Sequence, residues 1–298
     1  MRILHTSDWH LGRTLHGVDL LDHQRAFLDH LVALVAERDV DVVVVAGDVY
    51  DRAIPAVPTV ALLAEALERL SASATVIVTP GNHDSAVRLG FGSRLMRPGL
   101  RILADVSRLA EPVVVEDADG PVAFYGLPYL DPDTVRGVLA PTSPDAESRS
   151  VLPRSHEAVV SAALDRVRAD LAGRAGHRSV VLAHAFVVGG APSESERDIR
   201  VGGVDAVPSE VFHGVDYVAL GHLHGAQSVG SGDPVIRYSG SPLAFSFGEM
   251  TQVKSTALVD LDASGAVTIE LVPAPVPRRL SELTGDLGDL LSGRYDDF

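Results

Sequence analysis

Short, continuous apolar runs recur along the chain, and each of them ends in polar residues, often with a glycine. The clearest runs are residues 3–4, 42–46, 76–78, 180–183 and 217–220. Runs of this length that are rich in β-branched residues are typical of strands buried on both faces of a sheet. We therefore expect five buried strands at these positions.

Between these runs the apolar residues change to a helical spacing. In residues 20–38 they fall at i, i+1, i+4, i+7 and i+8, which places them on one face of a helix: Phe27, Leu28, Leu31, Leu34 and Val35. Residues 57–70 and 155–172 show a similar pattern, and Ser155 is a suitable N-cap for the latter. Strands that alternate with helices indicate an α/β layered fold.

The second half of the chain contains two hairpin patterns, in residues 112–128 and 235–272. They lead us to expect that the later sheet is antiparallel. Residues 131–153 are polar with four prolines, which predicts a surface loop. The stretch "PAPVPRR" reads as a linker, so we expect one domain over 1–275 and a separate segment over 276–298.

The composition limits the possible chemistry. The 298 residues include no cysteine, so a metal would have to be held by His, Asp, Glu or Asn. No apolar run approaches the roughly 20 residues of a membrane span, and the N-terminus is too polar for a signal peptide, so we expect a cytoplasmic protein. A net charge of −15 argues against passive coating of nucleic acid, although bound cations could reverse the field locally.

Side chains that can bind a metal follow all five apolar runs: Asp8 and His10; Asp48 and Asp51; Asn82, His83 and Asp84; His184; His222 and His224. The carboxyl ends of strands in such sheets are where ligands bind. Oxygen and imidazole donors suit Mn²⁺, Fe or Zn²⁺. The set is larger than one ion usually takes, and two ions about 3.5–4 Å apart would suit phosphoryl transfer.

Each motif alone has an ordinary interpretation as a turn, a capped loop or packed histidines. Together and in this order they favour a two-metal site. In an extended segment residues two apart point the same way, so His222 and His224 are spaced to reach one ion each. The seven other histidines are interpreted as surface or packed residues.

The ordered blocks Asp-x-His, Gly-Asp-x-x-Asp, Gly-Asn-His-Asp, a single His and Gly-His-x-His resemble those of the calcineurin-like metallophosphoesterases. The stretches "HTSDWHLGRTLHG", "GDVYDRAIP", "TPGNHDS", "VGG" at 201–203, "DYVALGHLHGAQ" and "RYSGSPLAFSFGE" are similar to the SbcD family, the bacterial Mre11-type nucleases. The resemblance covers residues 1–275. It implies a four-layer αββα sandwich of two mixed sheets flanked by helices.

The resemblance also implies roles for the candidate residues. One ion, most often Mn²⁺ in this family, would be held by Asp8, His10, Asp48 and His224. The second would be held by Asp48, Asn82, His184 and His222, with Asp48 shared. His83 would protonate the leaving oxygen, Asp51 would orient His83, and Arg52 would contact phosphate.

The implied function is a metal-dependent DNA nuclease that acts in DNA repair, recombination and replication. Such an enzyme would be a 3′–5′ exonuclease on duplexes and an endonuclease on single strands and hairpins. The implied partners are DNA, a second copy through helices at 57–71 and 86–97, and the SbcC-type ABC ATPase. "RRLSELTGDLGDLL" resembles the start of a capping domain that we expect to be truncated at Phe298, without the ATPase-docking segment.

Two alternatives remain open at this stage. A small-molecule or nucleotide phosphodiesterase could use the same fold and the same metal ligands. A non-catalytic scaffold could retain the fold in order to bind partners, although a complete ligand set with His83 disfavours it.

Overall fold

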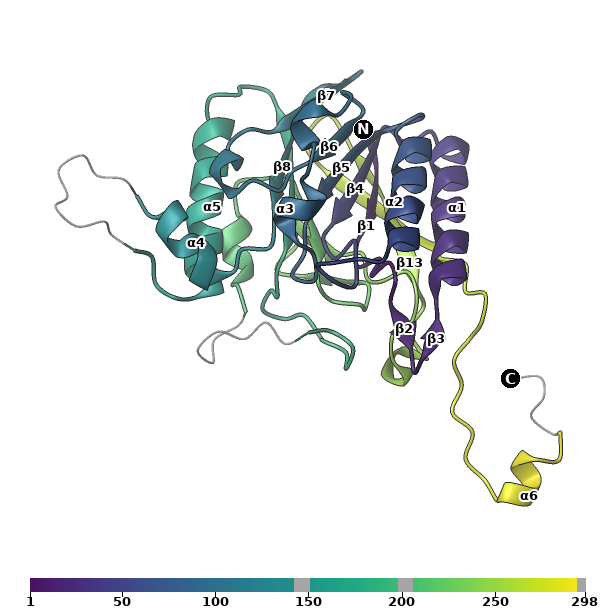
Figure 1. The fold of residues 1–298 in the computed structure, drawn as a ribbon. Coiled ribbons are helices and arrows are strands. Elements are labelled where there is room, and N and C mark those ends of the chain that lie inside the picture. Colours follow the sequence, from purple (N-terminus) through teal and green to yellow (C-terminus); the bar gives the residue numbers. More distant parts are fainter. Residues whose placement is uncertain (142–150, 198–205, 294–298) are drawn as a thin grey trace.

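Two six-stranded sheets pack face to face, and helices cover the outer face of each (Figure 1). The computed structural model describes residues 1–141, 151–197 and 206–293. Helices α1 and α2 lie against the first sheet, and α4 and α5 lie against the second. This arrangement confirms the expected αββα layers.

The first sheet has the order β14-β13-β1-β4-β5-β6. Its strands β1, β4, β5 and β6 are parallel, whereas β13 is antiparallel to β1 and to β14. The bounds are Arg2–Thr6 (β1), Val42–Ala46 (β4), Thr75–Thr79 (β5), Leu100–Ile102 (β6), Ser255–Leu261 (β13) and Val267–Pro273 (β14).

The second sheet has the order β11-β12-β10-β9-β8-β7. The bounds are Val113–Asp117 (β7), Gly120–Leu127 (β8), Arg178–His184 (β9), Tyr217–Gly221 (β10), Gln227–Val229 (β11) and Val235–Tyr238 (β12). Its four central strands are parallel, so the expectation of an antiparallel later sheet is wrong. Between β8 and β9 the chain passes through helix α5 and returns to the end at which β8 began, so β8 and β9 run parallel. The β13–β14 hairpin joins the first sheet instead.

The helices are α1 (Leu21–Glu37), α2 (Val57–Leu70), α3 (Ala86–Leu89), α4 (Pro132–Leu139), α5 (His156–Leu171) and α6 (Leu287–Leu290). The three helices expected from periodicity are confirmed, and the Ser155 hydroxyl accepts the N–H of Ala158 at 3.2 Å. A small hairpin of β2 (Thr14–Leu15) and β3 (Val18–Asp19) precedes α1.

Two local expectations are wrong. The expected loop at 131–153 contains α4, because Asp131 caps its N-terminus and both Val135 and Leu139 are buried; residues 142–150 lie outside the described part. The expected helix over 86–97 is only the four residues of α3, followed by a 3₁₀ turn at Ser93–Leu95. Gly92, with φ of 71°, lies between the two and interrupts the helix.

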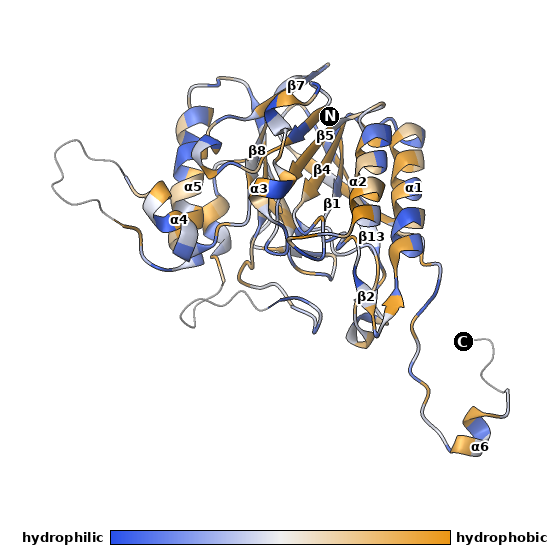
Figure 2. Ribbon diagram, viewed as in Figure 1, coloured by the Kyte–Doolittle hydropathy of each residue, from blue (hydrophilic) through white to orange (hydrophobic). Residues whose placement is uncertain are grey.

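The hydrophobic core lies between the sheets and on their outer faces, where the apolar sides of α1, α2 and α5 pack. Figure 2 shows apolar strands in the centre and flanking helices that carry both apolar and polar segments. None of the helices in the described ranges combines the length and apolar character needed to cross a bilayer. After β14 the chain leads away from the sheets to α6 (Figure 1).

A buried ion pair links β7 to β9 in the second sheet, at the end of β9 opposite to His184. Arg178 Nη2 lies 2.5 Å from Asp117 Oδ1, and Arg178 also donates to the carbonyl of Gly120 at 2.7 Å. Burial alone would raise the pKa of Asp117, but the hydrogen bond from Arg178 helps to hold it well below its usual range. Such a carboxyl stabilises the fold above its unfolded pKa near 4, and the contribution is lost as the pH falls.

The Arg178→Met variant should therefore lose about 1.5–3 kcal/mol of unfolding free energy at pH 7, because Asp117 loses a charged hydrogen-bond donor and keeps only the N-terminal ammonium of Met1, 2.8 Å away, as an ion-pair partner. The difference from the parent, measured by urea unfolding, should shrink toward pH 3. Arg108→Met, which breaks an exposed pair with Glu111, should leave the unfolding free energy essentially unchanged at either pH. A loss for Arg178→Met that does not change with pH would contradict this account.

Candidate metal centre

The seven predicted metal ligands converge where the carboxyl ends of the two sheets meet. We call them the ligand cluster: Asp8, His10, Asp48, Asn82, His184, His222 and His224. Segments after β1, β4 and β5 supply the first four, and β9 and the segment after β10 supply the three others. All except Asn82 are buried, so the two sheets enclose the cluster between them.

Three groups of donor atoms within the centre lie close enough to share an ion. Within each group the atoms are no more than 4.8 Å apart: Asp8, His10 and His224; Asp8, Asp48 and His184; His10, Asp48 and His83. Asp8, His10 and Asp48 each belong to two of them, so the three groups adjoin one another. His222 lies beside them, with its ring 5.4 Å from that of His184 and its backbone N–H donated to Asp8 Oδ1 at 3.0 Å.

The donor atoms face one another in an arrangement that a bound cation would stabilise. His10 Nε2 and His224 Nε2 are 3.2 Å apart, and His184 Nε2 lies 2.9 Å from Asn82 Oδ1. The other ring nitrogen of His184 donates to the carbonyl of Ala46 at 3.0 Å, so its Nε2 is left with a lone pair when the ring is neutral. Lone pairs that converge in a buried site are stabilised when a metal ion lies between them.

The charges of the centre support the same conclusion. Burial lowers the pKa of His10 and of His222, the latter to about 3, so both rings are neutral donors at pH 7. Burial raises the pKa of Asp8 to about 6. Burial alone would lower the pKa of His184, but the Asp48 carboxylate raises it to about 9. The Asp8 and Asp48 carboxyl groups thus lie in a buried site beside the neutral donors His10 and His222, an environment in which a bound cation would be stabilised.

Glycines allow the sheets to approach closely at this point. A Cβ on Gly221 would lie 1.8 Å from the carbonyl oxygen of Ala46, and one on Gly47 would lie 2.2 Å from His184 Nδ1. Gly47 also has φ of 87°, which other residues rarely adopt. The glycines therefore do more than turn the chain, because they make room for the ligands of the opposite sheet.

The backbone is strained at the ligands themselves. Positive φ angles occur at Asp8 (53°), His10 (43°), Asp48 (49°) and His222 (109°). A non-glycine residue in this region costs of order 1–2 kcal/mol, and such strain concentrates at functional sites. Within the described residues only His16 and Asp39 share this property among the non-glycine positions.

His83 lies at the edge of the centre with one ring nitrogen fixed. Its Nδ1–H donates to the backbone carbonyl of Asp51 at 2.9 Å, and its Nε2 is 3.9 Å from Asp48 Oδ2. The Asp51 carboxylate is farther from His83 Nδ1 (4.0 Å) than from His10 Nδ1 (3.7 Å). Asp51 thus positions His83 through its main chain. The Arg52 side chain is 75% exposed and lies 3.5 Å from the Asp51 carboxylate.

Asp84 is a possible metal ligand by its sequence motif, but in the structure its carboxylate binds backbone N–H groups. Its carboxylate accepts the backbone N–H groups of Val49, Tyr50 and Gly81 at 2.9–3.0 Å. Burial and the neighbouring Asp48 raise its pKa to about 7, against the three donors that favour the anion. Asp84 therefore ties together the two loops that carry the ligands. The "VGG" motif at 201–203 lies outside the described residues.

Sequence reasoning missed a second layer of residues behind the cluster. The Phe245 ring lies 5.3 Å from that of His10 and 5.5 Å from that of His224. Glu249, which is fully buried, contacts His224 Nδ1 and forms an ion pair with Lys254. The only signal in the sequence was the segment "YSGSPLAFSFGE", whose residues carried no individual assignment.

Comparison with known proteins identifies the family and supports the fold. The family model described as calcineurin-like phosphoesterase matches residues 1–226. The crystal structure of TT1561 from Thermus thermophilus aligns with a TM-score of 0.51 and 16% identity, over 91% of this chain and 98% of that one. GAP50, described as the anchor in the inner membrane complex of Plasmodium, aligns with a TM-score of 0.48 and 10% identity, over 94% and 87%.

Proposed function

The chain belongs to the calcineurin-like phosphoesterase family, and from this premise we propose that it is a metal-dependent DNA nuclease of the SbcD type. The broader assignment, a metal-dependent phosphoesterase, rests on the family match and on the buried Asp and His groups. The narrower one concerns the substrate, and it depends on what surrounds the ligands.

The observation that carries the proposal is the contact between the SbcD-like segments and the ligands. Phe245, from "YSGSPLAFSFGE", packs against His10 and His224, and the Arg13 guanidinium, from "LGRTLHG", lies 4.9 Å above the Phe245 ring. The two segments that resemble SbcD are thus built into the centre. A difference in substrate between family members would be expected to arise from such surroundings.

Three arginines around the centre suit a polyanionic substrate. Arg13 lies 3.6 Å from Asp51, the exposed Arg197 donates to the carbonyl of Asn82, and Arg52 extends into solvent. Guanidinium groups recognise phosphates well, and they offset an overall charge of −15 near the site.

Two divalent ions in the ligand cluster would neutralise the phosphodiester and activate a water. The chain itself supplies the remaining functions. His83 keeps Nε2 toward the cluster because Nδ1 is held by the Asp51 carbonyl. Burial lowers the pKa of His83 while the Asp48 carboxylate favours its charged form, and it is this doubly protonated ring that can transfer its Nε2 proton to the leaving 3′ oxygen. The donor set accepts Mn²⁺, Fe or Zn²⁺, and we propose Mn²⁺ by resemblance.

The test is digestion of end-labelled duplex DNA with Mn²⁺, together with hydrolysis of bis(p-nitrophenyl) phosphate and p-nitrophenyl phosphate. We expect DNA cleavage and hydrolysis of the diester. Activity on the monoester alone, or on cyclic nucleotides but not DNA, would replace the proposal with a small-molecule phosphoesterase. Failure to bind any divalent ion would instead favour the non-catalytic scaffold.

We also propose that two copies pair through the surface around α2 and α3. Five large apolar side chains there are at least 71% exposed: Ile54, Val57, Val87, Phe91 and Leu95. A hydrogen bond from Arg88 to the carbonyl of Ala53 joins the two segments that carry them. Exposed apolar side chains gathered in this way are typical of protein interfaces.

The Phe91→Glu/Leu95→Glu variant should therefore shift a dimer to a monomer in sedimentation velocity, because it places two charges in an apolar contact. Hydrolysis of bis(p-nitrophenyl) phosphate should be unchanged. Val253→Glu, at a residue 76% exposed elsewhere on the molecule, is the matched control and should leave the dimer intact. A parent protein that is monomeric at high concentration would refute the interface.

A further inference from the structure

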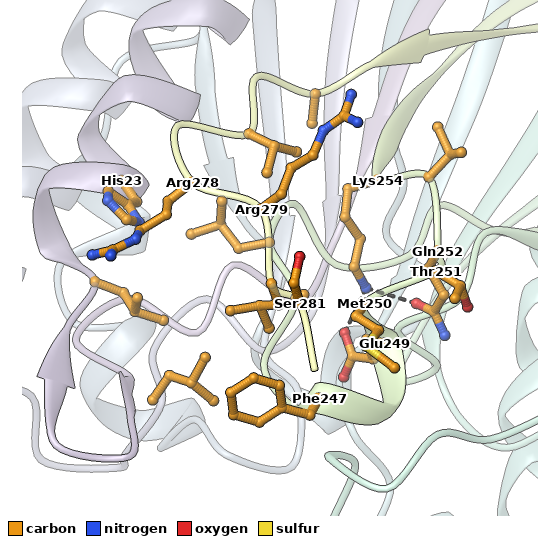
Figure 3. Close-up of a pocket in the computed structure, with 18 of the residues that line it drawn as sticks. His23, Phe247, Glu249, Met250, Thr251, Gln252, Lys254, Arg278, Arg279 and Ser281 are labelled. Atoms are coloured by element: carbon orange, nitrogen blue, oxygen red, sulfur yellow. Dashed lines mark hydrogen bonds and ion pairs between the residues drawn. The ribbon is translucent and has the colours of Figure 1, made fainter. Parts of the chain in front are cut away.

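A buried carboxylate and a buried ammonium lie behind His224, on the side away from the other ligands. Glu249 is 0% exposed and Lys254 is 4% exposed. Both belong to the segment that begins with the 3₁₀ turn at Phe247–Glu249. Figure 3 shows the Lys254 side chain pointing toward Glu249 and Gln252, beside a cavity of about 770 Å³. A buried ion pair is rarely better for stability than apolar packing, so this pair calls for another explanation.

The two residues and their neighbours hold His224 at three points. Its Nδ1 lies 3.2 Å from Glu249 Oε1 and 2.5 Å from the Ser195 hydroxyl oxygen. Its backbone carbonyl accepts from Lys254 Nζ at 3.1 Å, and its backbone N–H donates to Glu196 Oε1 at 2.8 Å. The ring is thus fixed in both position and rotation.

The chemistry of these contacts selects one tautomer of the ring. An ionised carboxylate can only accept hydrogen bonds, so the proton of neutral His224 is held on Nδ1. The Ser195 hydroxyl donates its own proton to Glu249. The Ser195 oxygen can therefore also accept a hydrogen bond from the Nδ1–H of His224. The lone pair then remains on Nε2, which is the atom that faces His10 Nε2 at 3.2 Å.

Lys254 keeps Glu249 in place. Its ammonium contacts Glu249 Oε2 at 2.5 Å, and it also donates to Ser241 at 2.9 Å and to Gln252 at 2.8 Å. With the contact to the His224 carbonyl, the ammonium has four partners, which leaves little freedom to the pair. Within the described part of the chain, the hydrogen bonds of Glu249 do not extend to the ligands on the other side of the cluster, namely His184, His222 and Asn82.

We propose that Glu249, held by Lys254, is a positioning residue that fixes His224 for one of the two metal positions and leaves the other unaffected. This rests on the proposed two-metal centre but not on the choice of DNA as substrate. Partners behind a metal-bound histidine commonly change metal affinity by 10–100-fold. The carboxamide introduced by Glu249→Gln could donate or accept, so it would no longer select the tautomer.

The experiment is calorimetric titration of metal-free protein with Mn²⁺, for the parent and for Glu249→Gln. We expect two binding events in the parent, and one of them to weaken by about 10–100-fold in the variant. The ring nitrogens of His224 in metal-free, ¹⁵N-histidine-labelled protein at pH 8.5 should report Nδ1 protonation in the parent and a mixture in the variant. Asp216→Asn, a carboxylate that contacts Ser179 in the second sheet, is the matched control and should change neither readout.

Unchanged affinities with an unchanged His224 signal would overturn the proposal, and so would equal weakening of both events. If Glu249→Gln does not fold, the Glu249→Gln/Lys254→Met variant removes both charges and leaves no unpaired ion. It should show the same selective loss. Because both readouts are independent of DNA cleavage, a failure of the nuclease proposal would be seen separately.

Discussion

The Asp48→Asn variant should lose phosphodiester hydrolysis by about 10³-fold or more and should bind neither divalent ion tightly. Asp48 Oδ2 lies 3.4 Å from His184 Nε2 and 3.6 Å from His10 Nε2, so its charge serves both sides of the cluster. Burial alone would raise its pKa, but the positive charge on His184 lowers it well below the usual range, so the carboxylate is charged at every working pH. An asparagine has the same shape without that charge.

Metal content by mass spectrometry and the rate on bis(p-nitrophenyl) phosphate would measure this effect. The asparagine oxygen can still accept the N–H of His83, now 2.9 Å from Asp48 Oδ1, so the local loop should keep its conformation. Asp216→Asn, remote from the centre, should retain full activity and metal. A variant at Asp48 that binds two ions and hydrolyses the diester normally would show that the chemistry takes place elsewhere.

The His83→Asn variant is expected to keep both ions and to lose about 10²–10⁴-fold in kcat, which is the range for removal of a general acid. The asparagine amide can still donate to the Asp51 carbonyl, as His83 Nδ1 does now at 2.9 Å, but it has no group that could transfer a proton from the position of Nε2. The loss should be largest for substrates with a poor leaving group, such as DNA, and smaller for a nitrophenyl ester.

Metal stoichiometry makes this a sharp test, because His83 also lies within reach of Asp48 and His10. If His83 were a ligand, the variant would lose an ion together with its activity. His213→Asn, at an exposed histidine, is the control and should change neither property. Full activity of His83→Asn would remove the proton-transfer role.

The strand ends could be predicted from the sequence because each apolar run stops at a polar, metal-capable residue. A run such as 42–46 must be buried on both faces, and the carboxyl ends of parallel strands meet at one edge. The same reasoning could not place the β13–β14 hairpin. An alternating pattern shows which face of a strand is buried but not which sheet it joins, and pairing of Leu258 with Leu4 is a long-range choice.

The surroundings of the ligands were beyond sequence reasoning for a different reason. Glu249 and Lys254 are charged, and such residues are expected at the surface unless a partner is known. The link from the Asp51 carbonyl to His83 is a main-chain contact, which no side-chain pattern reveals. The role of Asp84 as a tie between loops likewise follows from three backbone donors and not from its place in the Gly-Asn-His-Asp motif.

In this chain, metal binding and stability make opposing demands at the four ligands with positive φ angles, Asp8, His10, Asp48 and His222. Glycine would relieve the strain at each of them, by about 1 kcal/mol or more in the absence of metal, and would delete a ligand at the same time. A laboratory evolution experiment that rewards only heat resistance of the metal-free protein should therefore accumulate glycines at His10 and His222, whereas Asp8 and Asp48 should be retained because they also accept the backbone N–H groups of His222 and His83. Thermostabilised descendants would have to be screened for metal binding in every round, since the mutations most favourable to the fold are the ones that erase its chemistry.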